Sequence, residues 1–369
     1  MRNLDRFAVS RQFDRCAGLH ILYGAPDALG RQVCSGCSSQ STSFSLPAVN
    51  SELPLVSIII PTRPGQRDVP AVTAARLLDY PRERLEIIVA RGRQPSVQRN
   101  TALAAARGEV IYFLDDDTSP APDNLRRAAE SFKDEKIKMV GGPNLCPSDA
   151  PFLEQVFAVV LSSWLAFGPS RARYAKVGAA RPSSEKELIL CNLAARRADL
   201  LVLGGFDESL YPNEENALMD DLQKRGGKLL YDPEFVAYRR PRPSIDSFFK
   251  MLMTYGRGRA EQFRLHPTPR SILNFIPPLF CIYLTLVPVF GMTGFLVGVI
   301  PVVTWPLALL GQASVSAKQH GILKSLLAVP LVACTQIFYG LGFWRGLFTR
   351  VKPAAEKPRI DVTLERITL

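Results

Sequence analysis

The chain has 369 residues, of which 47% are hydrophobic and 21% are charged, and its net charge is +11. This length allows a catalytic domain together with further segments. The basic residues form no face with interleaved aromatic side chains, so nucleic acid is excluded as the expected partner. The seven cysteines include the closely spaced Cys34 and Cys37, but no second pair or nearby histidine completes a zinc site.

Residues 1–52 show no clear apolar periodicity and contain the polar patch SGCSSQSTSFS. They also lack the apolar core of a secretory signal. We therefore expect a loosely ordered N-terminal extension that precedes the folded part of the chain.

From residue 53 onward, short apolar runs alternate with segments of helical character. The expected strands are residues 55–61, 85–90, 109–114 and 138–143, and the expected helices are residues 71–78, 96–107 and 124–132. This alternation predicts an α/β fold, with a doubly wound and mainly parallel sheet flanked by helices. Ligands bind such sheets beyond the carboxyl ends of the strands, which is where Thr62 and Asp115 fall. An apolar helix is expected at residues 152–167.

The third expected strand ends in three consecutive carboxylates, Asp115, Asp116 and Asp117. Like charges placed side by side are unfavourable unless a cation lies among them. Mg²⁺-type sites need only one or two protein carboxylates together with phosphate oxygens, so a divalent ion bound with a phosphate ligand is one explanation. The other explanation is a polar strand end followed by a turn at residues 118–120.

A second pair of carboxylates, Glu214 and Glu215, follows Asn213, which we expect to cap a helix. The double glycine at residues 226–227 would end this helix. Acidic residues favour the first turn of any helix because of its macrodipole. The alternative is that one of the two carboxylates accepts a proton from an attacking hydroxyl group.

Residues 271–317 contain no Asp, Glu, Lys or Arg, and a further uncharged stretch covers residues 325–344. Two or three membrane-spanning segments of about 20 residues fit these lengths. Basic residues flank them, as expected beside the anionic cytoplasmic leaflet: Arg257, Arg259, Arg264 and Arg270 before, and Arg345, Arg350 and Lys352 after. Three spans would place the two basic flanks on opposite sides, so either the charge rule is overridden or one segment is re-entrant or interfacial. The Pro277-Pro278 pair favours the first segment as the irregular one.

Four segments in order resemble the motifs of family 2 glycosyltransferases: VSIIIPTR (56–63), QRNTALAAARGEVIYFLDDD (98–117), GGFDESLYPNEENALMDDLQKRGGKLLYDP (204–233) and YGRGRAEQFRLHP (255–267). Members of this family are inverting enzymes that have the GT-A fold and use nucleotide diphosphate sugars. The YGRGR segment followed by apolar helices looks most like the subgroup that builds bacterial exopolysaccharides and lipid-linked glycans.

The resemblance implies a role for each matching residue. Asp115 and Asp117 match a DxD pattern that holds Mg²⁺ or Mn²⁺ on the donor diphosphate, and Glu215, next to Glu214, matches the general base. A metal there would neutralise charge on the leaving nucleotide. The residues implied in nucleotide-sugar binding are Thr62, Arg99, Asp115, Asp116, Arg257 and Arg259.

Two features depart from the family pattern. Arg257 and Arg259 lie where related enzymes have a QxxRW-like segment, but Gly258 takes the place of Trp. These arginines either bind the diphosphate or anchor a helix to lipid headgroups. Arg91 and Arg93 stand where the family has acidic residues, one of which contacts the nucleotide base, so the identity of the nucleotide is open.

These observations divide the chain into an extension (1–52), a GT-A domain (53–267), a membrane domain of two or three hydrophobic segments (268–348) and a basic tail (349–369). We expect a multi-pass protein of the inner (cytoplasmic) membrane with a cytoplasmic catalytic domain. It would transfer a sugar from a nucleotide diphosphate sugar to a lipid-linked or polysaccharide acceptor, with membrane lipid as a further partner.

Two alternative functions stay open. A nucleotidyltransferase also has a nucleotide domain with acidic metal ligands, but it would not explain the helix that begins at Glu214 or the membrane segments. A catalytically inactive glycosyltransferase-like membrane scaffold or glycan-binding protein is the other alternative. The basic residues Arg91 and Arg93, in place of acids, are its support.

Overall fold

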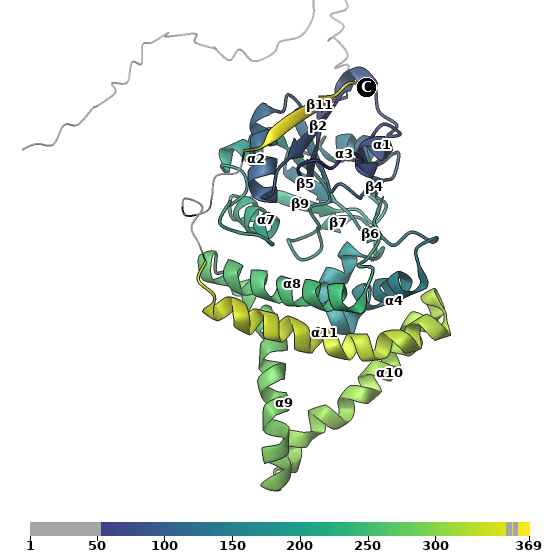
Figure 1. The fold of residues 1–369 in the computed structure, drawn as a ribbon, viewed down its shortest axis with the longest axis vertical. Coiled ribbons are helices and arrows are strands. Elements are labelled where there is room, and N and C mark those ends of the chain that lie inside the picture. Colours follow the sequence, from purple (N-terminus) through teal and green to yellow (C-terminus); the bar gives the residue numbers. More distant parts are fainter. Residues whose placement is uncertain (1–52, 352–355, 357–360) are drawn as a thin grey trace, which may run out of the picture. The chain divides into compact units, whose positions relative to one another are not determined.

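The computed structural model describes residues 53–351, residue 356 and residues 361–369. The predicted extension, with Cys34 and Cys37, lies outside these residues. Within the described part, an α/β domain is followed by long apolar helices and by one further strand (Figure 1).

The strands of the described chain form two sheets. They are β1 (Val56–Thr62), β2 (Leu85–Arg91), β3 (Val110–Leu114), β4 (Ser119–Pro120), β5 (Ile137–Gly141), β6 (Asn144–Leu145), β7 (Arg181–Pro182), β8 (Asn192–Arg196), β9 (Lys228–Tyr231), β10 (Ala237–Tyr238) and β11 (Thr363–Ile367). The larger sheet has the order β11-β2-β1-β3-β8-β5-β9-β7, and the smaller has the order β4-β10-β6. In the larger sheet β1 is parallel to β2 and β3, and β5 is parallel to β9, whereas the other pairs are antiparallel.

The predicted α/β sheet with flanking helices is confirmed, although the sheet is mixed rather than mainly parallel. The expected fourth strand, β5, does not pair with β3, because β8 lies between them and runs antiparallel to both. β8 reads NLAAR and has no β-branched or aromatic residue, so the pattern of apolar runs does not reveal it. Residues 349–369 were expected only as a basic tail, but residues 363–367 form the edge strand β11.

The helices of the α/β domain and its border are α1 (Pro70–Ala75), α2 (Pro95–Ala105), α3 (Asn124–Ser131), α4 (Phe152–Leu161), α5 (Trp164–Phe167), α6 (Arg197–Val202), α7 (Glu214–Lys224) and α8 (Ile245–Leu265), with the short 3-10 helices η1 (Arg82–Arg84) and η2 (Gly168–Arg173). The expected apolar helix at residues 152–167 is broken. α4 and the following α5–η2 stretch are bent by 61°. The break occurs at Ser163, whose hydroxyl caps α5 by accepting from the Ala166 backbone N–H.

Apolar side chains cover both faces of the larger sheet. Neighbouring residues of a strand point to opposite faces, so Ile59 and Ile88 belong to one core cluster, whereas Ile58 and Ile60 belong to the other. α2 and α7 complete the first cluster, and α1 and α3 complete the second. Burying each such side chain stabilises the fold by about 1.5–3 kcal/mol. The two layers hold the carboxyl ends of β1 and β3 at one edge of the sheet.

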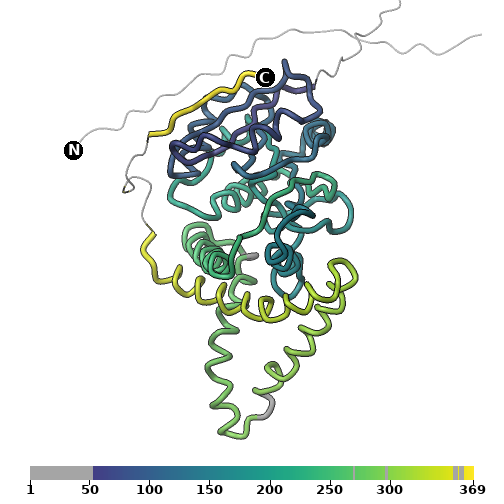
Figure 2. Tube along the Cα trace, turned by 45° about the vertical axis from the view of Figure 1, so that its right-hand side comes forward, coloured from purple at the N-terminus to yellow at the C-terminus, as the bar shows by residue number. Residues whose placement is uncertain are grey.

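Long apolar helices follow α8. These segments are η3 (Pro269–Phe275), α9 (Ile276–Met292), η4 (Leu296–Val299), α10 (Ile300–His320) and α11 (Ile322–Phe348). The helical stretches Ser271–Met292, Ile300–His320 and Ile322–Phe348 are each long and apolar enough to cross a membrane. α11 lies alongside α8, and α9 and α10 lead away from the two as a hairpin (Figures 1 and 2).

α8 and α11 approach each other closely at glycines. A Cβ on Gly256 of α8 would overlap the backbone oxygen of Tyr339, and one on Gly342 of α11 would overlap the backbone oxygen of Met253. Gly346 of α11 meets α8 in the same way, one turn further along. The glycines therefore allow the two helix backbones to touch, and α11 becomes part of the support beneath the α/β domain.

Candidate active site

The polar residues predicted from strand ends and from the start of a helix meet in one cavity of about 820 Å³. Thr62 ends β1, Asp115 and Asp116 follow β3, and Glu214 and Glu215 begin α7. Because β1 and β3 are parallel neighbours, their carboxyl ends open at the same edge of the sheet. All five residues line the cavity.

Arg99 of α2 links the two groups of carboxylates. It is buried, and it donates from Nη1 to Glu214 Oε1 at 2.8 Å and from Nη2 to Asp115 Oδ1 at 3.0 Å. Removing one member of such a buried set is costly, because it leaves the other charges without compensation. Arg99 is therefore a positioning residue for both carboxylates, and its predicted contact with the nucleotide stays a prediction.

Arg239, directly after β10, is absent from the predicted site. Its Nη1 lies 2.9 Å from Asp115 Oδ2, and its Nε lies 2.7 Å from Asp117 Oδ1. Burial by itself would raise the pKa of Asp115, but Arg239 and Arg99 outweigh burial and lower this pKa. The signal that points to Arg239 is the basic turn RRPRP, whose Arg242 also lines the cavity.

The predicted metal ligands, Asp115 and Asp117, are thus joined through a guanidinium group. No three or more His, Cys, Asp or Glu side chains of the described residues are grouped so that they could hold a metal ion. Two carboxylates nevertheless fit an Mg²⁺ or Mn²⁺ ion that takes its other ligands from phosphate oxygens. Arg239 and such an ion would compete for the same carboxylate oxygens.

Glu214 and Glu215 have different surroundings although they are neighbours. Glu214 is 2% exposed, and burial, followed by the charge of Glu215, raises its pKa to about 7 although Arg99 opposes the shift. Its Oε2 has no hydrogen-bond partner among the described residues. Glu215 is partly exposed, and its Oε1 accepts from the Asn216 side-chain amide at 3.2 Å. The first carboxylate is tied to an ion pair, and the second is more open to a ligand.

Asn213 precedes α7 as expected, but its side chain does not cap the helix. Its φ is 85°, and its Oδ1 accepts from Asn216 Nδ2 at 2.7 Å. Gly258 of α8 lies against it, since a Cβ there would overlap the Asn213 side chain. The small residue at the position where the family pattern has Trp therefore lets α8 approach the start of α7.

The two arginines of the YGRGR segment, Arg257 and Arg259, have different surroundings in the structure. Arg259 is buried and lines the cavity, where its Nη2 donates to Asn216 Oδ1 at 3.3 Å. Arg173 donates to the same oxygen at 2.7 Å, and burial together with the Arg173 charge lowers the pKa of Arg259. Arg257 instead donates to the Tyr211 carbonyl at 3.3 Å and does not line this cavity. Two guanidinium groups that share one neutral oxygen favour the binding of an anion.

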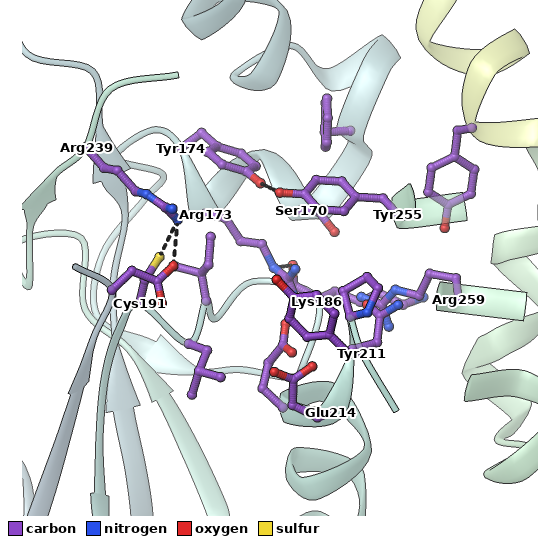
Figure 3. A pocket seen from close by; sticks show the side chains of 18 of the residues that line it. Ser170, Arg173, Tyr174, Lys186, Cys191, Tyr211, Glu214, Arg239, Tyr255 and Arg259 are labelled. Atoms are coloured by element: carbon purple, nitrogen blue, oxygen red, sulfur yellow. Dashed lines mark hydrogen bonds and ion pairs between the residues drawn. The ribbon is translucent and has the colours of Figure 1, made fainter. Parts of the chain in front are cut away.

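The cavity continues from these charged groups to the apolar helices (Figure 3). We call the part at Asp115, Glu214 and Glu215 the carboxylate end. The apolar end is lined by residues of α5, η3, α9 and α11, namely Trp164, Leu165, Phe167, Leu273, Ile276, Pro277 and Tyr339. One cavity thus joins a charged site to the place where the apolar helices begin.

Arg91 and Arg93, which stand where the family pattern has acidic residues, lie in different surroundings. Arg93 lines the cavity, whereas Arg91 is bound to β11. Arg91 donates to a Glu365 carboxylate oxygen from Nε at 3.1 Å and from Nη2 at 2.8 Å. Pairing with β11 therefore accounts for Arg91, and Arg93 is the charge that faces a ligand.

Residues 73–156, which include β3 and the aspartates that follow it but not Glu214 and Glu215, match the family model described as Glycosyl transferase family 2. This part of the α/β domain is similar to family 2 glycosyltransferases. The match confirms the predicted resemblance and, with it, the GT-A type of the fold.

Succinoglycan biosynthesis protein ExoA of Rhizobium meliloti (strain 1021) is 29% identical over 149 residues, which are 39% of this chain and 43% of the relative. The similarity to this relative therefore spans less than half of its length.

Two solved structures are similar at lower identity. Mannosyltransferase PcManGT from Pyrobaculum calidifontis, in complex with GDP-Man and Mn²⁺, is 18% identical with a TM-score of 0.49, over 76% of this chain and 87% of that chain. S. aureus TarS 1–349 is 12% identical with a TM-score of 0.37, over 79% of this chain and 90% of that chain. With TM-scores below 0.5, these two structures carry no conclusion about this chain.

Proposed function

We propose that the chain transfers a sugar, with inversion, from a nucleotide diphosphate sugar to a lipid-linked acceptor at the cytoplasmic face of the inner membrane. The observation that carries this proposal is the cavity that joins the carboxylate end to the apolar end. A charged donor suits the first, and an acceptor with a hydrocarbon chain suits the second. The apolar end therefore favours a lipid-linked acceptor over a free polysaccharide.

The donor would bind at the carboxyl ends of β1 and β3. Thr62, Asp115 and Asp116 line this part of the cavity, and Arg239 adds a cation beside them. When bound, an Mg²⁺ or Mn²⁺ ion would be held by Asp115 and Asp117 and would supply Lewis-acid stabilisation of the leaving diphosphate. Arg239 supplies positive charge at the same point, which is the kind of fixed electrostatic stabilisation that favours a charged leaving group.

Glu215 is the proposed general base. It would take the proton of the acceptor hydroxyl while that oxygen forms a bond to the anomeric carbon and the bond to the nucleotide diphosphate breaks. Attack from the side opposite the leaving group inverts the configuration at that carbon. Glu214 would hold Arg99, and through it Asp115, so that the donor and base ends of the site keep their spacing.

The acceptor would enter from the apolar helices. Arg173 and Arg259 lie on the cavity wall and share the Asn216 side-chain oxygen, so a phosphate group of the acceptor could bind between them. Its chain would then lie along the apolar end, beside α9 and α11. The similarity to an exopolysaccharide biosynthesis protein supports a glycan of that kind as the destination of the sugar.

The test uses the full-length protein in lipid nanodiscs with sugar-labelled UDP, GDP and TDP donors, Mn²⁺, and a long-chain polyprenyl phosphate. We expect label in the lipid phase with one of the donors, and no label with Glu215→Gln, which still binds the nucleotide. Label only in water-soluble polysaccharide would replace the lipid acceptor with a glycan. Nucleotide binding by folded protein without transfer to any acceptor would support the inactive scaffold.

A further inference from the structure

The strand β11, which follows the apolar helices in the chain, is part of the sheet of the α/β domain. It pairs antiparallel with β2 from Thr363 opposite Arg91 to Ile367 opposite Ile87. Leu364 packs against one core cluster and Ile367 against the other. The Arg91–Glu365 ion pair at 2.8 Å adds a side-chain link. This segment therefore lies on the same side of any membrane as the α/β domain.

This placement limits how often the chain can cross a bilayer. The chain leaves the α/β domain after α8 and returns to it at β11, so the number of crossings between them is even. Three helices in this interval have the length and apolarity of a span. At least one of them therefore does not cross. The same reasoning applies to the bent α4–α5 pair, because strands of the α/β domain precede and follow it.

Both ends of the α9–α10 hairpin lie at the layer formed by α4, α8 and α11. At the start of α9, the Pro278 carbonyl accepts from the indole N–H of Trp344 in α11 at 3.1 Å. At the end of α10, the His320 ring lies 3.5 Å from the Ser162 hydroxyl, next to α4. Between these anchors the hairpin carries no charged residue up to Lys318, and little of it is buried against protein. It therefore has the surface of an element surrounded by hydrocarbon.

α11 differs from the hairpin because one of its faces is covered by the protein along its length. That face carries the glycines that touch α8, and it also packs against α4. Large apolar side chains are exposed near the two ends of α11, at Ile322, Leu323, Leu326 and Leu327 and again at Leu341 and Phe348. A helix with protein on one side and exposed apolar side chains fits the surface layer of a bilayer.

We infer that the chain enters and leaves the bilayer through one face only, with α9–α10 inserted as a hairpin and α11 lying in the membrane interface beneath the α/β domain. The basic residues next to these helices, Lys318, Lys324, Arg345 and Arg350, then fall on the same side as the α/β domain. This removes the conflict between three spans and the positive-inside rule. In this arrangement the third apolar segment, α11, takes the interfacial position. The Pro277-Pro278 pair had favoured the first segment as the irregular one.

The experiment compares three single-cysteine variants of the full-length chain in a background without the native cysteines. The reporters are Glu135→Cys in the α/β domain, Gln319→Cys at the α10–α11 junction and Asp361→Cys just before β11, all at exposed positions. Sealed membrane vesicles of each orientation are treated with a membrane-impermeant maleimide. We expect all three cysteines to react in one orientation and to be protected in the other.

Two results would contradict the inference, and each points to a different part of it. Reaction of Gln319→Cys from the opposite side would make α11 a true span, and reaction of Asp361→Cys from the opposite side would remove β11 from the sheet. Either result overturns the inference without affecting the proposed activity, which does not depend on the number of crossings. If the cysteine-free chain does not insert, short epitope tags at the same three positions in the native background give the same comparison by protease protection.

Discussion

The carboxylate end and the apolar end of the cavity are held in place by different forces. At the carboxylate end, charges from four parts of the chain meet, on Arg99, Asp115, Glu214 and Arg239. At the apolar end, α8 and α11 touch through their backbones at positions such as Gly256. Ion pairs can exchange partners when a ligand brings its own charge, whereas touching backbones leave no room for an added atom. Function should therefore depend on charge at one end and on shape at the other.

The largest expected effect comes from removing the proposed base at the charged end. Glu215→Gln should lower kcat by about 10³-fold, because a general base contributes about 10²–10⁴-fold. Calorimetry should show unchanged nucleotide affinity. Asp221→Asn is the matched control, because Asp221 is a partly exposed carboxylate of the same helix, paired with Lys224 and outside the cavity lining. A Glu215→Gln protein with full kcat would contradict the assignment and direct attention to Glu214.

The next effect concerns the cation that holds the two aspartates. Arg239→Gln should lower kcat/KM by about 100-fold, because one lost electrostatic contact to the leaving group is worth about that factor. It should also tighten Mn²⁺ binding, measured calorimetrically with nucleotide present, because Asp115 Oδ2 and Asp117 Oδ1 are no longer paired with Arg239. Arg239→Lys should restore part of the rate. Equal Mn²⁺ affinity in the native protein and Arg239→Gln would rule out the competition.

A packing change tests the apolar end. Gly256→Ala forces the Tyr339 backbone away, and overpacking of this kind costs about 1–3 kcal/mol, so the Tm in detergent should fall by about 5 °C. Gly311→Ala in α10 is the control, because its added Cβ meets no atom of the described residues within 4 Å apart from the nearby backbone of its own helix. Its Tm should not fall, since Ala is favoured over Gly in helices by about 1 kcal/mol. Equal Tm values for the two variants would show that α8 and α11 do not touch.

The smallest effect is on the pH dependence of stability. The folded protein keeps the Glu214 proton up to a pKa of about 7, whereas the unfolded carboxyl releases it near 4.5. Between these values the folded state binds more protons, so stability falls as the pH rises. Relative to Glu214→Gln, the native protein should therefore lose stability from pH 5 to pH 8, measured as the Tm difference at each pH. A difference that does not change with pH would mean that the Glu214 pKa is not raised.

The parts of the molecule that sequence predicted well are those encoded locally. An apolar run that ends in Asp115–Asp117, and a helix that starts at Glu214, place their side chains without reference to distant residues. The parallel pairing of β1 with β3 then gathers them at one edge of the sheet. The family match over residues 73–156 includes the first of these motifs.

The rest of the site depends on residues far apart in the chain. Arg239 reaches Asp115 across more than a hundred residues, and the basic turn RRPRP in which it lies does not show which carboxylates it pairs with. Strand β8 lacks the usual strand residues and forms because β3 and β5 leave a place between them. α11 looks like a span by composition, and only its contact with α8 shows that one of its faces is already covered.

Strand β11 has a consequence for the way the protein is made. During synthesis β2 emerges long before β11, so this edge of the sheet stays unpaired until the hairpin and α11 have been produced. Exposed edges invite pairing with other chains, and β11 closes this one. If the α9–α10 hairpin were inserted so that the end of α10 lay on the opposite side of the membrane from the α/β domain, β11 could not pair with β2 of the same chain. The edge strand β11 can therefore complete the sheet only in chains that have been inserted into the membrane correctly.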